Sequence, residues 1–179
     1  VVLATQNPVE QEGTYTLPEA QLDRFMAKVV VGYPSEADYL SIIDRTTTTE
    51  KTVITPVCTG EQILAMRSIV RAVPVSTQVG TYAVRLIIGT QPGSAYAPEL
   101  VNKYVALGAS PRGVQSVLLL SKVRALMEGR FAVSCQDIRA VAVPALRHRL
   151  VLNFAGQAER VSADEIIKAV VTNARELSE

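Results

Sequence analysis

Several residue types that mark particular protein classes are scarce in this sequence. It has two cysteines, Cys58 and Cys135, one histidine and no tryptophan. The two cysteines lack the paired spacing that a disulfide framework or a zinc site needs. We therefore expect neither feature, and a reduced, cytoplasmic setting fits the composition best.

Long apolar runs and an excess of one charge are also missing. No apolar run approaches the length that spans a bilayer, and the start lacks the basic and then apolar layout of a signal peptide. The 179 residues include 18 Lys and Arg against 17 Asp and Glu, so the chain has no overall electrostatic footprint for nucleic acid or an anionic membrane. We expect no membrane span, no nucleic-acid partner, and only local anion sites.

Motifs of phosphate and hydrolase chemistry are absent as well. The sequence has no G-x-x-x-x-G-K-[ST] loop, and the acidic pair at residues 164–165 follows Ser-Ala rather than an apolar strand, so it is no Walker-B-like metal ligand. No Ser or Cys nucleophile accompanies His148 in a recognised signature. We expect no metal site in this chain, and we expect His148 to occupy a solvated or partner-facing helix end.

The apolar residues that are present follow two different patterns. Residues 1–5 and 26–31 are short β-branched runs, typical of buried strands in a parallel sheet. From residue 35 onward the apolar spacing is helical. The predicted fold class is mainly α, with a remnant of about two strands from an α/β core before a helical domain, and a boundary at residues 32–34. A lone buried strand needs neighbours on both sides, so we expect the chain to be a truncation of a larger sheet domain.

Capping signals predict where several helices begin. Capping-box spacing occurs at Thr59 with Gln62, at Ser134 with Asp137 and at Ser162 with Glu165. Residues 17–25 predict a short helix capped by Thr16 with Glu19. Pro144 is expected to end or kink a helix, because proline cannot donate a backbone hydrogen bond.

The first candidate site residue is Asn7, in the sequence Thr5-Gln6-Asn7-Pro8 after the first predicted strand. Ligands of open α/β sheets bind outside the carboxyl ends of strands, where an amide can orient a water or a phosphate oxygen. An Asn-Pro turn is the alternative, and spacing alone favours the turn.

The second and third candidates are arginines at helix ends. Arg24 closes the predicted helix 17–25, where it either stabilises the helix dipole, paired with Asp23 or Glu19, or is offered to a neighbour's phosphate. Arg112 lies in the first turn of a helix capped by Ser110. A cation opposes the dipole there, so an anion ligand would help explain Arg112, and Gly113 would let a phosphate approach the backbone.

Taken together, these motifs resemble the MoxR family of AAA+ ATPases. The matching segments are residues 4–8 (ATQNP), 10–15 (EQEGTY), 17–25 (LPEAQLDRF), 32–34 (GYP), 108–113 (GASPRG) and 146–150 (LRHRL). The resemblance covers nearly the whole chain and is weak between residues 44 and 107. It implies that residues 1–34 are the C-terminal part of an AAA+ α/β core and that residues 35–179 are an all-helical lid of about five to seven helices.

The resemblance also implies roles for the three candidates. Asn7 corresponds to the sensor-1 residue, Arg24 to the arginine finger and Arg112 to the sensor-2 arginine. ATP and Mg²⁺ are expected to be held mainly by an N-terminal half that this sequence lacks, so the chain is expected to be inactive alone. A homo-oligomeric ring, expected to be a hexamer, and a client protein, in some cases with a von Willebrand factor A domain partner, complete the implied function of remodelling or maturing other proteins.

Two rival functions remain open on sequence grounds. One is a non-enzymatic helical module that binds a protein partner through residues 35–179, with no dependence on nucleotide. The other is a DNA-handling AAA+ protein, which the balanced charge disfavours. The MoxR-type ATPase is the function that we predict.

Overall fold

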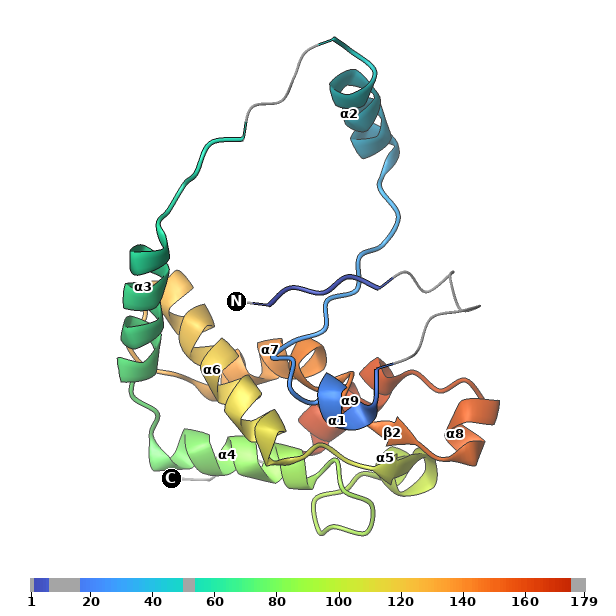
Figure 1. Cartoon of the computed structure of the whole chain (residues 1–179). Helices are drawn as coiled ribbons and strands as arrows, with labels where there is room; N and C mark the ends of the chain where they lie inside the picture. The colour runs from blue at the N-terminus through green and yellow to red at the C-terminus, as the bar shows by residue number, and fades with distance from the viewer. Residues whose placement is uncertain (1, 7–16, 50–53, 175–179) are drawn as a thin grey trace.

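The computed structural model describes residues 2–6, 17–49 and 54–174 (Figure 1). The helices and strands in chain order are α1 (Glu19–Leu22), α2 (Glu36–Thr46), α3 (Gly60–Ala72), α4 (Thr77–Ile88), α5 (Glu99–Tyr104), β1 (Val105–Leu107), α6 (Pro111–Met127), α7 (Cys135–Leu146), β2 (Val151–Leu152), α8 (Phe154–Ala158) and α9 (Ala163–Asn173). The mainly α fold class is thereby confirmed.

The helices after α3 pack into one body around the pair α6 and α7 (Figure 1). Helix α4 packs against both members of the pair, and α9 packs against α7. The core consists of fully buried apolar side chains from all four helices, including Tyr82, Leu86, Val117, Ile138, Leu146, Ile166 and Ile167. Their helical spacing produces one buried face on each helix, because residues three and four apart share a face.

A small antiparallel ribbon completes the body. Strands β1 and β2 pair with Val105 opposite Leu152 and Leu107 opposite Val151. We expected the region after residue 34 to be all-helical, but it contains this two-stranded sheet. Strands of two and three residues are too short to produce a period of two in the sequence. In the described part, eight helices begin after residue 34 rather than about five to seven, and the short α5 and α8 account for the difference.

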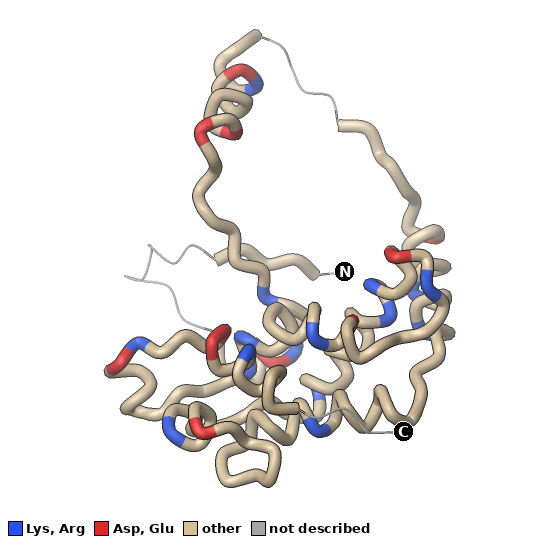
Figure 2. The backbone as a smooth tube through the Cα atoms, turned by 180° about the vertical axis from the view of Figure 1, so that it is seen from behind, with Lys and Arg blue, Asp and Glu red and all other residues tan. Residues whose placement is uncertain are grey.

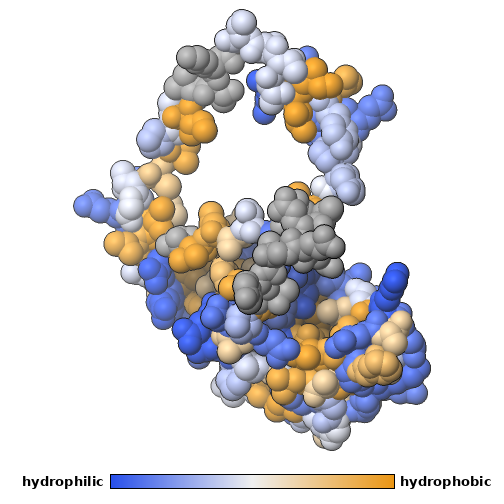
Figure 3. Space-filling view, turned by 45° about the vertical axis from the view of Figure 1, so that its right-hand side comes forward, coloured by the Kyte–Doolittle hydropathy of each residue, from blue (hydrophilic) through white to orange (hydrophobic). Residues whose placement is uncertain are grey.

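The arm, defined as residues 29–49 and 54–59, extends away from the body and carries α2 (Figure 1). Its apolar side chains are exposed, and the space-filling view shows them on the projecting segment (Figure 3). Tyr39, Leu40, Ile42 and Ile43 of α2 are each 45–60% exposed. The helical spacing of these residues was predicted correctly, but in this structure their apolar face packs against no other described element.

The two predicted strands at residues 1–5 and 26–31 are wrong as local structure. The described residues 2–6 and 27–34 form no regular structure. Leu3 is 91% exposed and Val31 is 90% exposed. A buried parallel strand forms only when neighbouring strands accept and donate its backbone hydrogen bonds. No sheet lies beside these segments among the described residues, so the apolar runs remain extended and uncovered.

The capping predictions are mostly confirmed. Both hydrogen bonds of the capping box are present at Thr59 with Gln62 and at Ser134 with Asp137. Ser162 caps α9 through the backbone N–H of Asp164, without the predicted Glu165 box.

Two further helix-end predictions differ from the structure. The predicted helix 17–25 shortens to Glu19–Leu22 with Pro18 at the N-cap, and its predicted cap Thr16 lies outside the described residues. Pro144 lies inside α7, which ends two residues later at Leu146.

Charges of both signs are interspersed over the molecule, as Figure 2 shows. No helix within the described ranges is long and apolar enough to cross a membrane. The same residues contain no group of three or more His, Cys, Asp or Glu that could hold a metal ion.

Candidate functional site

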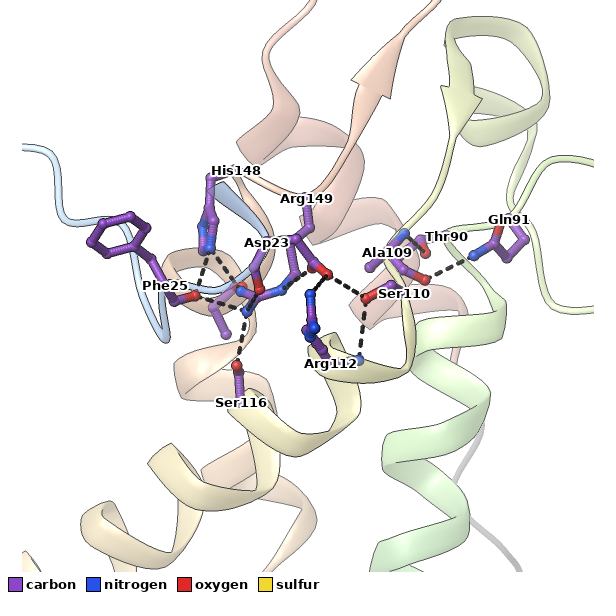
Figure 4. A network of polar contacts seen from close by, with 11 residues as sticks. Asp23, Phe25, Thr90, Gln91, Ala109, Ser110, Arg112, Ser116, His148 and Arg149 are labelled. Carbon is purple, nitrogen blue, oxygen red and sulfur yellow. Dashed lines mark hydrogen bonds and ion pairs between the residues drawn. The ribbon is translucent and has the colours of Figure 1, made fainter. Parts of the chain in front are cut away.

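Arg149 joins the segment that follows α1 to the helical body (Figure 4). Its side chain is 1% exposed, and its Nε donates to Asp23 Oδ1 over 3.0 Å. One terminal nitrogen donates to the Asp23 carbonyl at 3.0 Å, the Phe25 carbonyl at 2.8 Å and Ser116 Oγ at 2.9 Å. The other donates to the Ala145 carbonyl. This guanidinium therefore ties the segment 23–25 to α6 and α7 at once.

The second carboxylate oxygen of Asp23 contacts residues at the start of α6. Ser110 Oγ donates to Asp23 Oδ2 over 2.9 Å and accepts from the backbone N–H of Arg112 over 3.2 Å. The Arg112 guanidinium lies 3.5 Å from the same Oδ2. The predicted helix start, with Ser110 as N-cap and Pro111 in the first turn, is confirmed. In this structure the anion that Arg112 meets is a carboxylate of its own chain.

The loop before Arg112 is held by the end of α4 (Figure 4). Thr90 Oγ1 accepts from the Ala109 N–H at 2.9 Å, and Gln91 Nε2 donates to the Ala109 carbonyl at 2.8 Å. Gly108 lies so close to Thr90 that an added Cβ would sit 2.3 Å from the Thr90 carbonyl oxygen. Only glycine permits this approach, which fixes the position from which α6 begins.

Gly113 does not have the role that we predicted for it. It is buried, and an added Cβ would lie 3.2 Å from Ala109 and Leu146 side-chain atoms and 3.3 Å from Ile87. The residue therefore allows α6 to pack closely against α7 and α4, and its backbone is covered by apolar side chains rather than open to a phosphate.

Arg24 and Arg112 line one surface hollow of about 230 Å³, together with Asp23, Met26, Gln115, Ser116, Leu119 and Arg149. Arg24 is exposed, and its guanidinium makes no hydrogen bond or ion pair with another residue that the structure describes. The suggested pairing of Arg24 with Asp23 or Glu19 is wrong, because Asp23 is engaged by Arg149, Ser110 and Arg112. The hollow thus combines three arginines with one carboxylate.

His148 is half-buried beside this site rather than solvated. Its Nε2 lies 3.0 Å from the Phe25 carbonyl oxygen and 2.8 Å from Arg149. A neutral imidazole nitrogen can accept from Arg149 or donate to the carbonyl, but not both. Burial, reinforced by the positive charges of Arg149 and Lys28, lowers the pKa of His148, which favours the neutral ring. The predicted solvated or partner-facing helix end is therefore wrong, because the ring faces residues of its own chain.

The structure brings together two of the three predicted site residues. Arg24 and Arg112 share the hollow, whereas Asn7 lies outside the described residues. Arg149 was not predicted from the sequence as a site residue, and Asp23 was predicted only as one of two alternative partners of Arg24. The apolar residues 150–152 that directly follow Arg149 were the one signal that its side chain would be buried.

Comparisons with known proteins identify the families that this chain resembles. Residues 97–170 match the family model "AAA lid domain", and residues 1–27 match the model "ATPase family associated with various cellular activities (AAA)". Chaperone MoxR1 of Mycobacterium tuberculosis is 37% identical over 96% of this chain and 45% of its own length. Protein MoxR of Paracoccus denitrificans is 28% identical over 89% of this chain and 50% of its own length.

A solved structure is similar over almost the whole chain. The crystal structure of a putative ATPase from Cytophaga hutchinsonii has a TM-score of 0.89 and 32% identity, and the match covers 97% of this chain and 53% of that one. The 179 residues therefore span about half the length of the relatives and of the solved structure that they match.

Proposed function

The chain belongs to the MoxR-type AAA+ ATPases, and from this premise we propose that it carries the lid and the phosphate-facing arginines of an ATPase that remodels partner proteins. Residues 1–34 would complete an AAA+ core whose phosphate loop lies outside the 179 residues, and residues 35–179 would form the lid. The single observation that supports this function best is the shared hollow of Arg24 and Arg112.

The chemistry of the hollow fits phosphate. A guanidinium presents its N–H donors in a planar fork that matches phosphate oxygens, and it stays charged at any physiological pH. Arg24 is exposed and has no described partner, and the Arg112 side chain is 51% exposed, so both can reach an external anion. ATP supplies such an anion when bound, and its Mg²⁺ would be held with it by the phosphate-binding half.

Arg24 and Arg112 would bind the phosphates of one nucleotide. Because they line the same hollow, both would contact a single phosphate chain, and that chain must come from outside the described residues. In the proposed ring, which we expect to be a hexamer, it is the ATP of the adjacent subunit. Arg24 would act as the arginine finger, which stabilises the charge of the transition state and contributes roughly 10³- to 10⁵-fold in rate. Arg112 would act as the sensor-2 arginine and link nucleotide to the lid.

Asn7 completes the proposed catalytic set as the sensor-1 residue. Its amide would orient the attacking water and the γ-phosphate without adding charge. Hydrolysis in the ring would rotate the lid, and we propose that this motion acts on a client protein, with a von Willebrand factor A domain protein as a candidate partner.

The test is the ATPase rate as a function of protein concentration in the protein that joins this chain to a phosphate loop. The rate per subunit should rise as rings assemble. Arg24→Ala should lower the rate at least about 1,000-fold while ATP binding changes little, because the finger acts only on a neighbour's nucleotide. Arg45→Ala, an exposed arginine at the end of α2 on the arm, is the matched control and should leave the rate unchanged.

Two results would contradict the proposal. One is a wild-type protein that hydrolyses no ATP at any concentration, which would favour a helical module that only binds proteins. The other is an Arg24→Ala protein that loses ATP binding together with hydrolysis, which would assign Arg24 to its own subunit's nucleotide rather than a neighbour's.

A further inference from the structure

We propose that the Asp23 carboxylate takes the place of phosphate at Arg112. It pairs with Arg112 when no nucleotide faces the hollow, and the pair separates when nucleotide phosphate binds there. This inference rests on the proposed function, because the displacing phosphate is that of the nucleotide. Asp23 would thereby regulate the site without taking part in its chemistry.

The contacts of Asp23 divide into a strong and a weak set. Oδ1 accepts from Arg149, whose side chain is 1% exposed and is also bonded to main-chain carbonyls of residues 23 and 25. Oδ2 faces Ser110 and Arg112. The Arg112 side chain is 51% exposed, and its guanidinium lies 3.5 Å from Oδ2. A buried, multiply bonded charge pair is costly to break, whereas an exposed pair contributes little. Arg112 is therefore the contact that can exchange.

A phosphate oxygen is chemically equivalent to Asp23 Oδ2 for Arg112, because both are anionic oxygens that a guanidinium N–H can contact. Two anions cannot share this arginine closely, because like charges a few ångströms apart repel. Phosphate bound at Arg112 thus releases it from Asp23. Arg149 keeps Asp23, and with it the main chain next to Arg24, in place throughout.

The consequence is a link between two contacts on one turn. Asp23 and Arg24 are consecutive. The residue that holds the main chain beside Arg24, the proposed arginine finger, is therefore also the residue that pairs with Arg112, the proposed sensor-2 arginine. An empty hollow leaves the start of α6 bound to residue 23 through both Ser110 and Arg112. Phosphate in the hollow removes the contact between Asp23 and Arg112. Asp23 and Arg149 are therefore positioning residues that act through Arg112.

The experiment is an NMR titration of the 179-residue chain with tripolyphosphate, following the arginine Nε–H signals. Asp23→Asn should bind the probe about 5-fold more tightly than the wild type, equivalent to about 1 kcal/mol, because the competing carboxylate is gone. The gain should vanish when Arg112→Ala is added to Asp23→Asn. The matched control is Asp164→Asn, which removes the same charge from an ion pair with Arg147 at 2.7 Å and should bind like the wild type.

Equal binding by wild type and Asp23→Asn would overturn the inference, as would a gain that persists without Arg112 or that Asp164→Asn reproduces. If Asp23→Asn fails to fold, the wild-type titration still decides. The Arg112 signal should then shift with added probe while the Arg149 signal stays, and equal shifts of both would overturn the inference. Hydrolysis enters none of these readouts, so they can fail while the proposed ATPase activity stands, and the reverse also holds.

Discussion

Replacing Arg149 by alanine tests whether one buried side chain holds residues 23–25 against the helical body. The substitution removes a side chain that is 1% exposed. With it go the hydrogen bonds that Arg149 donates to the Asp23 carboxylate, to the carbonyls of residues 23, 25 and 145, and to Ser116. Removing one partner of a buried, hydrogen-bonded ion pair costs about 3–5 kcal/mol. We expect a loss of unfolding free energy of that size.

The assay is urea unfolding of the 179-residue chain followed by far-UV circular dichroism. In a parallel thermal melt, a loss of about 3–5 kcal/mol corresponds to a fall in Tm of roughly 6–20 °C for a domain of this length. A local readout accompanies it. The Lys28 N–H donates to the Pro144 carbonyl over 2.9 Å, and its hydrogen exchange should accelerate once residues 23–25 are released.

Arg147→Ala is the matched control, on the same turn. Arg147 pairs with Asp164 at 2.7 Å, but the Asp164 side chain is 36% exposed, so the pair should contribute no more than about 1 kcal/mol. Arg149→Lys should recover only part of the loss, because an ammonium cannot supply the planar fork. A loss below about 1 kcal/mol for Arg149→Ala, or one equal to that of Arg147→Ala, would refute the assigned role of the buried arginine.

Two further predictions concern single positions in the body. Gly108→Ala should destabilise the chain by about 1–3 kcal/mol, because the added Cβ would lie 2.3 Å from the Thr90 carbonyl oxygen. Gly80→Ala inside α4 has open space and should stabilise the chain by about 0.5–1 kcal/mol. Thermal unfolding that ranks the two variants the other way would contradict this packing. Hydrogen bonding from Arg130 lowers the pKa of Asp137 to about 2. The difference in unfolding free energy between wild type and Asp137→Asn should therefore be largest above about pH 4 and shrink as the pH falls toward 2. Unfolding curves whose separation is constant across that range would argue against the ion pair.

Much of the local structure follows from the sequence alone. The helical spacing after residue 35 and the capping pairs Thr59 with Gln62 and Ser134 with Asp137 involve residues within one or two turns, and the structure contains each of them. The motif at residues 108–113 likewise predicted the N-cap Ser110 and the first-turn position of Arg112. Short-range hydrogen bonds and periodicity need no knowledge of distant neighbours.

The tertiary structure decided which distant groups meet. Asp23 and Arg149 are 126 residues apart, and no spacing rule links a carboxylate after a four-residue helix to an arginine after another helix. The same limit made Gly113 look like an opening for phosphate, although it is a packing contact. The apolar runs at residues 1–5 and 26–31 show the converse, since their composition predicts strands but a strand exists only where a partner supplies its hydrogen bonds. Sequence thus determined the elements whose partners lie nearby in the chain, and only folding determined the charge network that joins them.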